Sequence, residues 1–322
     1  MNENKDRKTS VSISSFLDMG EQPLRMELVA AASGLKRNIT EAAINRPGLA
    51  FSGFFQYFAH RRIQVLGLAE YAYLSSLSEA DRRKRLRDFF EKRIPCVIVA
   101  RNKKVFPDSI DLAEEFTVAV LKTKMITKYF VNAATIIMEN LLAPRMTVQG
   151  TMVEIMGIGV LIEGEAGMGK SETALGLIKM GHALVSDDLT ALRLDSAGSV
   201  IGSPMSSTRY HMEIRGLGII HVPSLFGVSS VREEKKLDMV ATLCDLKTLE
   251  NEYKNDKLKK TRVFFGVDIP QVFIHVASGR DLANVIETAT LDQKLKRLGH
   301  DAEKELDEKL IELMSGGKNV SE

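Results

Sequence analysis

The sequence contains no tryptophan, only two cysteines and few aromatic residues, which make up 6% of its 322 residues. The two cysteines, Cys96 and Cys244, are far apart and each lies within an apolar run, so we expect buried free thiols in a reduced, cytoplasmic protein rather than a disulfide framework. No apolar stretch approaches the roughly 18 residues of a membrane-spanning helix. The polar N-terminus also lacks the apolar core of a secretory signal.

A large excess of charge of one sign is missing as well. Lysine and arginine number 44 against 42 acidic residues, which leaves a net charge of +2 and no electrostatic reason to expect a nucleic acid partner. The basic run at 81–87 is close to acids at Glu79, Asp88 and Glu91, and we interpret it as the solvated face of a helix. With 44% hydrophobic and 27% charged residues the chain is globular, and its length favours two domains of about 150 residues.

The first half alternates short apolar runs typical of strands with helical patterns. Strands are predicted at Arg62–Gly67 and Ile94–Ala100, and a helix is predicted from the N-cap Ser78 to about Arg93. Apolar residues at helical spacing predict two further helices, at Asp111–Met125 and Lys128–Leu142. This alternation predicts a small α/β domain over residues 1–140.

The second half, residues 141–322, begins with strands. A hairpin is predicted from Thr151–Ile155 and Gly159–Glu163, followed by a glycine-rich loop, a helix at Lys170–Met180 and a short strand at Ala183–Ser186. More strands are expected up to Val276, and two amphipathic helices, 281–298 and 302–314, end the domain.

The strongest motif lies between that hairpin and that helix and matches G-x-x-x-x-G-K-[ST] in full. Its glycines let backbone N–H groups face a phosphate chain at the positive end of a helix. The lysine reaches the β- and γ-phosphates and the serine is a ligand for Mg²⁺. A chance glycine-rich turn is the alternative, and the strand–loop–helix context argues against it. The predicted nucleotide-binding residues are Gly164, Glu165, Ala166, Gly167, Met168, Gly169, Lys170 and Ser171.

Two further sequence elements are more informative because this loop is present. Asp187 and Asp188 end the next strand; such a pair most often caps a helix or a turn, but here one carboxylate can hold Mg²⁺ and the other can accept a proton. A Walker B aspartate usually lies on a more distant strand, so this spacing argues against the ordinary GTPase or ABC arrangement. The third element, Glu213–Ile220, has two glycines around an apolar residue, and a β-bulge with a surface ion pair explains it about as well.

Together these elements resemble one family, HPr kinase/phosphorylase, over nearly the whole chain. The resemblance rests on GEAGMGKSETAL at 164–175, GHALVSDD at 181–188, EIRGLGII at 213–220, GVDIPQVFIHV at 266–276 and LKRLG at 295–299, with RPGL at 46–49 and RIQVLG at 62–67 in the first half. It implies a P-loop kinase domain related to phosphoenolpyruvate carboxykinase behind a separate N-terminal α/β domain. It also implies ATP- and Mg²⁺-dependent phosphorylation of a serine on HPr, the reverse phosphorolysis that consumes phosphate and releases pyrophosphate, and a homohexamer.

The resemblance assigns roles by position. Lys170 corresponds to the P-loop lysine, Asp188 to the group that acts as base in phosphorylation and as acid in the reverse reaction, and Arg215 to the segment that serves both reactions. The Mg²⁺ ligands that it implies are Ser171, Glu213 and Asp187, and Arg280 corresponds to a late loop tied to phosphorolysis.

The sequence also departs from the family pattern. Gln149 stands where the family usually has a catalytic histidine, and Tyr253-Lys254-Asn255 stands for Tyr-Asp-Arg, so that Lys254 supplies charge without a bidentate fork. His221 replaces an aspartate or asparagine, and Asp281 replaces an asparagine.

Phosphorolysis brings two anions together and depends more on cations than the kinase direction, in which Mg²⁺ and Lys170 already neutralise ATP. We therefore expect kinase activity to survive and phosphorolysis to be weakened. The alternatives are a catalytically silent protein that senses nucleotide or phosphate, which the Gln149 and Asn255 departures motivate, and a kinase of a small molecule.

Overall fold

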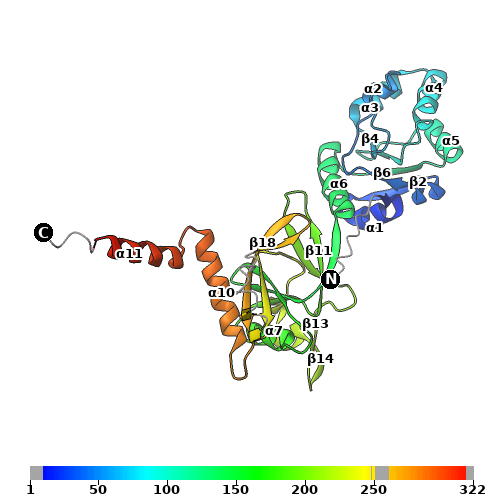
Figure 1. Ribbon diagram of the computed structural model, residues 1–322. Coiled ribbons are helices and arrows are strands. Elements are labelled where there is room, and N and C mark those ends of the chain that lie inside the picture. The colour runs from blue at the N-terminus through cyan, green and yellow to red at the C-terminus, as the bar shows by residue number, and fades with distance from the viewer. Residues whose placement is uncertain (1–9, 248, 251–260, 317–322) are drawn as a thin grey trace. The chain divides into compact units, whose positions relative to one another are not determined.

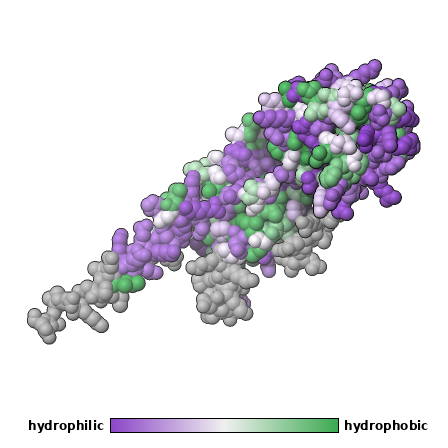
Figure 2. Space-filling model, turned by 90° about the horizontal axis from the view of Figure 1, so that it is seen from above, coloured by the Kyte–Doolittle hydropathy of each residue, from purple (hydrophilic) through white to green (hydrophobic). Residues whose placement is uncertain are grey.

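The computed structural model describes residues 10–247, 249–250 and 261–316. The chain divides into two compact units, which meet in sequence at Pro144 and Arg145. No helix in these described stretches is long and apolar enough to cross a bilayer. The face seen in Figure 2 is mostly hydrophilic with scattered hydrophobic patches. Cys96 and Cys244 are both buried and free, which confirms the prediction of buried free thiols.

The N-terminal unit is built on a four-stranded sheet of order β2-β6-β5-β4 (Figure 1). β4, β5 and β6 run parallel to one another, and β2 pairs antiparallel with β6. A small pair, β1 with β3, accompanies the sheet. The strands are β1 (Val11–Ser12), β2 (Met26–Ala30), β3 (Asn38–Ile39), β4 (Gln64–Leu66), β5 (Cys96–Val99) and β6 (Ala119–Thr123).

Helices cover both faces of this sheet. In β5, Val97 and Val99 pack into one hydrophobic cluster, while Cys96 and Ile98 pack into the other. A strand buried on both faces reads as a continuous apolar run, which explains why Ile94–Ala100 was recognisable. The first face carries α2 (Gly48–Phe51), α3 (Leu68–Ser76), α4 (Glu79–Phe90) and α5 (Pro107–Phe116), and the second carries α1 (Ile13–Leu24) and α6 (Thr127–Leu142).

Most of the predicted elements of this unit are confirmed, but the helix predicted over Asp111–Met125 is right only up to Phe116. α5 ends there, its C-cap Thr117 has a left-handed φ of 56°, and β6 begins at Ala119. The residues Val118–Leu121 are fully buried between two layers of helices. A short apolar run of this kind fits a buried helix and a buried strand equally well by periodicity, so the pattern could not separate them.

The basic run 81–87 lies on α4, as predicted, but its ion pairs are made with α5. Arg82 contacts Asp108 at 2.9 Å and Arg87 contacts Glu115 at 2.6 Å. The acids expected from the sequence at Glu79, Asp88 and Glu91 are not the partners in these pairs. The run therefore joins two helices on one face of the sheet.

The C-terminal unit contains a six-stranded sheet of order β10-β8-β9-β16-β18-β17. Its centre, β9-β16-β18, is parallel, and the outer strands pair antiparallel. A four-stranded antiparallel sheet, β15-β12-β11-β7, and a hairpin, β13-β14, complete the unit. The strands are β7 (Arg145–Gln149), β8 (Thr151–Ile155), β9 (Ile158–Glu163), β10 (Ala183–Ser186), β11 (Leu189–Leu194), β12 (Val200–Pro204), β13 (His211–Ile214), β14 (Gly218–His221), β15 (Lys235–Lys236), β16 (Met239–Cys244), β17 (Thr261–Phe264) and β18 (Val267–His275).

Two helices pack together beside the larger sheet and share its hydrophobic cluster. They are α7 (Lys170–Lys179) and α10 (Leu282–Arg297), and a Cβ added at Gly176 would lie 2.9 Å from the Cβ of Ala283. This close approach explains why a glycine is tolerated inside α7. The remaining helical elements are α8 (Val222–Phe226) and α11 (Ala302–Gly316). The hairpin β8-β9, α7, β10 and both C-terminal helices are confirmed where the sequence predicted them.

Candidate active site

The glycine-rich loop joins the end of β9 to the first residue of α7. Gly167 and Gly169 have φ angles of 85° and 83°, and no atom lies within 4 Å of a Cβ added at either position. Conformation rather than space therefore requires glycine at these two positions. Gly169 is the N-cap of α7, and no side chain caps this helix end. The free N–H groups of the first turn and the helix dipole together favour an anion at this position.

Lys170 is folded back over this loop. Its Nζ donates hydrogen bonds to the carbonyl oxygens of Gly164, at 2.9 Å, and Glu165, at 3.0 Å. The residue is only 9% exposed although it carries an ammonium group. The loop thus holds a cation on its inner side, where a phosphate chain would need one.

The carboxylate of Asp187 is the centre of a hydrogen-bond network. Its Oδ1 accepts from the hydroxyls of Thr151, at 2.8 Å, and Ser171, at 2.9 Å. Its Oδ2 accepts from the backbone N–H of Glu213, at 3.1 Å. Asp187 is 6% exposed and Thr151 is fully buried. One carboxylate therefore ties strand β8, the start of α7 and the hairpin β13-β14 to a single point.

Asp188 has a different environment from its neighbour. It is exposed, and its φ of 62° is left-handed, a conformation that aspartate tolerates better than most residues. Its carbonyl accepts from the N–H of Gly150 at 2.8 Å, and the next residue, Leu189, pairs with Gln149 across β11 and β7. The two aspartates therefore differ in environment. The Asp187 carboxylate is buried and accepts three hydrogen bonds, whereas the Asp188 carboxylate is exposed.

The segment Glu213–Ile220 is a β-hairpin, not a bulged strand. Gly216 and Gly218 have positive φ angles, and Arg215, which lies in the turn, is exposed. The backbone of Glu213 reaches the Asp187 carboxylate, while its side chain is exposed. The structure therefore brings Glu213 to Asp187 through the main chain.

A cavity of about 530 Å³ opens beside the glycine-rich loop. Its lining includes four residues that the sequence predicted for the site, Gln149, Gly164, Glu165 and Met168. It is also lined by residues of β7, β9, β16, β17 and β18, and by the residue after β16, which the sequence did not single out as site residues because nothing in a buried strand pattern marks one polar residue as facing a cavity. These are Thr147, Val148, Glu163, Thr242, Leu243, Cys244, Asp245, Arg262, Gln271 and Phe273.

Two of these unforeseen residues are joined to each other. Gln271 Nε2 donates to Thr242 Oγ1 at 2.8 Å, across the paired strands β16 and β18. Burial, with a contribution from the charge of Asp245, raises the pKa of the Cys244 thiol. A thiol kept protonated in this way is a poor nucleophile, so the cavity offers hydroxyl, amide and carboxylate chemistry rather than thiolate chemistry.

The other predicted residues lie apart from this network. Arg280 is exposed and its Nη1 donates to the carbonyl of His275 at 3.2 Å. Asp281 is the N-cap of α10 and accepts from the N–H of Asn284 at 3.2 Å. The predicted site residue Lys254, with its neighbours Tyr253 and Asn255, lies outside the described residues.

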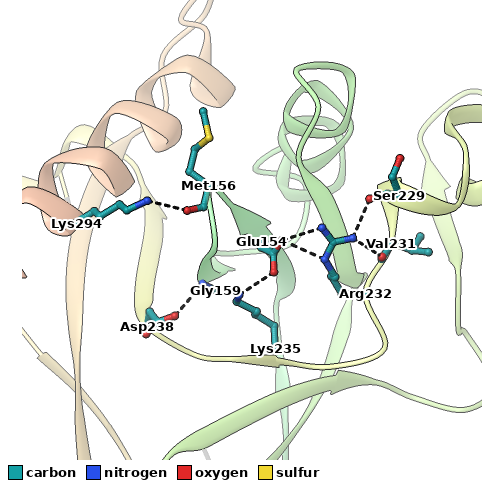
Figure 3. Close-up of polar contacts among 9 residues, drawn as sticks. All are labelled: Glu154, Met156, Gly159, Ser229, Val231, Arg232, Lys235, Asp238 and Lys294. Carbon is teal, nitrogen blue, oxygen red and sulfur yellow. Dashed lines mark hydrogen bonds and ion pairs between the residues drawn. The ribbon is translucent and has the colours of Figure 1, made fainter.

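A second polar network braces the hairpin that leads into the glycine-rich loop (Figure 3). Glu154 of β8 contacts Arg232 at 2.9 Å and Lys235 at 2.8 Å. Asp238, which is 7% exposed, accepts from the N–H of Gly159 at 3.0 Å. Lys294 of α10 donates to the carbonyl of Met156 in the hairpin turn at 3.0 Å. The hairpin is thus held to the 229–238 segment and to α10.

Comparisons with known proteins agree along the whole chain. Residues 11–138 match the HPr Serine kinase N terminus and residues 140–310 match the HPr Serine kinase C-terminal domain. The HPr kinase/phosphorylase of Leptospira biflexa is 39% identical over 289 residues, which cover 89% of this chain and 90% of that protein. The one from Caldicellulosiruptor bescii is 38% identical over 92% of this chain and 96% of its own length.

A solved structure, the Hpr(Ser) kinase/phosphatase from Coxiella burnetii, aligns with 50% of this chain and 97% of its own at 31% identity, with a TM-score of 0.43. Both family models match in the same order, and together they span nearly all of the described residues. On these matches, and on the identity to relatives of similar length, the chain belongs to the HPr serine kinase family.

Proposed function

We propose that this protein transfers the γ-phosphoryl group of ATP to a serine hydroxyl of HPr in a Mg²⁺-dependent reaction, and that it catalyses the reverse phosphorolysis only weakly. The observation that carries the proposal is the Asp187 network, which fixes the hydroxyl of Ser171 beside the anion site at the start of α7. Family membership supplies the substrate, since the relatives are named HPr kinase/phosphorylase.

The glycine-rich loop and α7 bind the phosphate chain in this proposal. The first-turn N–H groups of α7 donate to phosphate oxygens, and Lys170 exchanges the carbonyls of Gly164 and Glu165 for the β- and γ-phosphates. The nucleoside extends into the adjoining cavity of about 530 Å³. Gln149, on the cavity wall, donates a hydrogen bond but does not exchange a proton near neutral pH.

The oxygen atoms near Ser171 fit Mg²⁺, which prefers hard oxygen ligands and few protein side chains. Ser171 Oγ and a carboxylate oxygen of Asp187 lie 2.9 Å apart, and the exposed side chain of Glu213 starts from a backbone that is bonded to the same carboxylate. These three residues would hold the ion, which neutralises the charge on the phosphate oxygens when bound.

Asp188 is the residue that we assign as the general base. Its exposed carboxylate accepts the proton of the serine hydroxyl as that oxygen attacks phosphorus, and it returns a proton in the reverse direction. Arg215, in the exposed hairpin turn, and Lys254 are the proposed cations for the transferring group. Neither Gln149 nor Asn255 restores the titrating or bidentate group of the family pattern, which is why the proposal makes phosphorolysis the weaker reaction.

The test follows the mass of HPr in the presence of ATP and Mg²⁺. We expect a gain of one phosphoryl group, lost in Asp188→Asn, which removes the charge but keeps a residue that tolerates a positive φ. Asp111→Asn, at an exposed carboxylate of α5, is the matched control and should leave transfer intact. Binding of ATP without any mass change would support the silent sensor instead.

A second arm tests the direction of the reaction. Seryl-phosphorylated HPr is incubated with excess inorganic phosphate and no ATP, and release of pyrophosphate is measured. We expect slow release that increases in the double variant Gln149→His, Asn255→Arg. Rapid release before these substitutions would refute the claim of weak phosphorolysis without touching the kinase assignment.

A further inference from the structure

The sheet of the N-terminal unit brings the first residues of several helices to one edge. β4, β5 and β6 are parallel, so their carboxyl ends share one edge, and α3, α5 and α6 begin there. α3 packs on one face of the sheet and α6 on the other. In open α/β sheets, ligands bind outside the carboxyl ends of the strands.

The first residues of these two helices meet at this edge. A Cβ added at Gly67, the N-cap of α3, would lie 3.0 Å from Thr127 Oγ1 and 3.1 Å from both Arg46 Nη2 and Glu70 Oε2. Three polar side chains from distant parts of the sequence therefore converge on a glycine that leaves room for them. The convergence lies entirely within the N-terminal unit.

One of the three polar groups has no partner among the described residues. Glu70 Oε2 accepts from Arg46 Nη2 and from the N–H of Gly67, both at 2.9 Å. Thr127 is 7% exposed, and its Oγ1 makes no hydrogen bond. Buried hydroxyls are nearly always paired, so the unpaired Thr127 hydroxyl, which lies beside Gly67 at this edge, calls for an unseen partner.

The helix that begins at Thr127 also has an uncompensated positive end. Its N-cap, Ile126, makes no side-chain cap, and its first turn contains no acid but does contain Lys128. By contrast, α3 is capped by Glu70 and α4 by Ser78. Four N–H groups at the start of a helix without a cap favour an anion.

The segment around Arg46 and the loops that follow β5 and β6 are basic. The segments 45–48, 100–106 and 124–126 carry Arg46, Arg101, Lys103, Lys104 and Lys124 and no acid. Arg101 and Asn102 have consecutive left-handed φ angles of 62° and 52°, and their N–H groups donate to the carbonyls of Met125 and Thr123. Strained non-glycine backbone of this kind concentrates at ligand sites. It also links the loop after β5 to the loop that leads to Thr127.

We propose that this edge of the sheet, at the start of α6, binds a small molecule through a phosphate group. The Thr127 hydroxyl and the first-turn N–H groups of α6 donate to the phosphate oxygens, and Arg46, Lys124 and Lys128 supply positive charge. Glu70 stays engaged with Gly67 and Arg46, so it closes the end of α3 and leaves α6 as the phosphate-binding helix. This site is separate from the glycine-rich loop and does not depend on the proposed kinase reaction.

Hydrogen–deuterium exchange on the full chain tests the proposal, because it separates the two units by peptide. The probes are inorganic phosphate and glycerol 3-phosphate, compared with sodium chloride at equal ionic strength. We expect slower exchange in peptides covering residues 66–72, 100–106 and 124–131. Protection confined to the 164–171 loop, or equal protection by chloride, would overturn the proposal.

Variants test which side chains contact the phosphate group. Thr127→Val replaces the orphan hydroxyl by a methyl group of the same shape, so we expect a higher melting temperature together with loss of the phosphate-dependent protection. The double variant Lys124→Gln, Lys128→Gln should lose the protection as well, while Lys84→Gln, an exposed cation on α4, should keep it. Unchanged protection in Thr127→Val and in the double lysine variant would refute the assigned contacts.

Discussion

Thr151 is the residue whose replacement tests the Asp187 network most directly. Thr151→Val keeps the shape of a fully buried side chain and removes only the hydroxyl that donates to Asp187 Oδ1 at 2.8 Å. A hydrogen bond to a charged group contributes about 1.5–3 kcal/mol, and Asp187 has no solvent with which to replace it. We therefore expect the free energy of unfolding to fall by that amount.

The consequence for thermal unfolding follows from the size of the unit. For a domain of 150–250 residues, 1 kcal/mol corresponds to about 2–4 °C in melting temperature, so the C-terminal unit should melt roughly 3–12 °C lower. Because Ser171 donates to the same oxygen as Thr151, loss of one donor also loosens the orientation of the other. In the proposed kinase, we expect a higher Mg²⁺ concentration for half-maximal activity.

Two variants control this experiment. Thr151→Ser keeps the hydroxyl and should retain most of the stability and the Mg²⁺ dependence. Thr190→Val removes another fully buried threonine hydroxyl nearby, which bonds to Ser186 Oγ at 2.6 Å and to the carbonyl of Gly150 at 2.9 Å but not to Asp187. It removes two hydrogen bonds between uncharged groups, so it should cost about 1–3 kcal/mol, and it should leave the Mg²⁺ dependence alone. Equal effects of the two valine variants on both measurements would show that the Asp187 contact has no special role.

Three further predictions concern the brace shown in Figure 3. Burial opposes ionisation of Glu154, but hydrogen bonds from Lys235 and Arg232 outweigh burial and lower the pKa of Glu154. The stabilising contribution of its carboxylate is therefore present above about pH 4.3 and is lost as the pH falls through the lowered pKa. Glu154→Gln should flatten an acid unfolding titration in that range, and a titration that keeps the wild-type slope would contradict this. Asp238→Ala strands the N–H of Gly159 and should cost roughly 1–3 kcal/mol in urea unfolding; an unchanged midpoint would argue against the contact. In Gly159→Ala the new Cβ would meet the carbonyl oxygen of Lys236 at 2.0 Å, so we expect a loss of at least about 1–3 kcal/mol, and wild-type stability would show that the two strands separate freely.

The sequence was sufficient for features that neighbouring residues encode by themselves. The glycine-rich loop needs a strand, a set of glycines and a helix in direct succession, and all of them lie within residues 158–179. The N-cap at Ser78 and the hairpin turn at Met156-Gly157 are local in the same sense. Periodicity failed at 111–125, where burial on both faces of β6 removes the alternation by which a strand is recognised.

Contacts across the sheet were beyond reach for a different reason, and Thr151 shows why. It meets Asp187, 36 positions away, because β8 and β10 pair antiparallel, and their register shifts between Leu184 and Ser186. Without that shift the pairing of Leu184 with Val153 would continue evenly, which would place Ser186 opposite Thr151 and Asp187 one position further on, opposite Gly150.

An irregularity of one residue in a strand cannot be predicted from hydrophobic periodicity. In the structure, however, a slip of one residue turns every following side chain to the other face. The aspartate pair was readable as chemistry because it ends a strand beside a phosphate loop. Which of its two carboxylates is buried and bonded to Ser171, and which is exposed, depends on the register. The register shift in β10 therefore decides which aspartate is buried, and a variant that restores an even register should exchange the environments of Asp187 and Asp188 before it disturbs the loop.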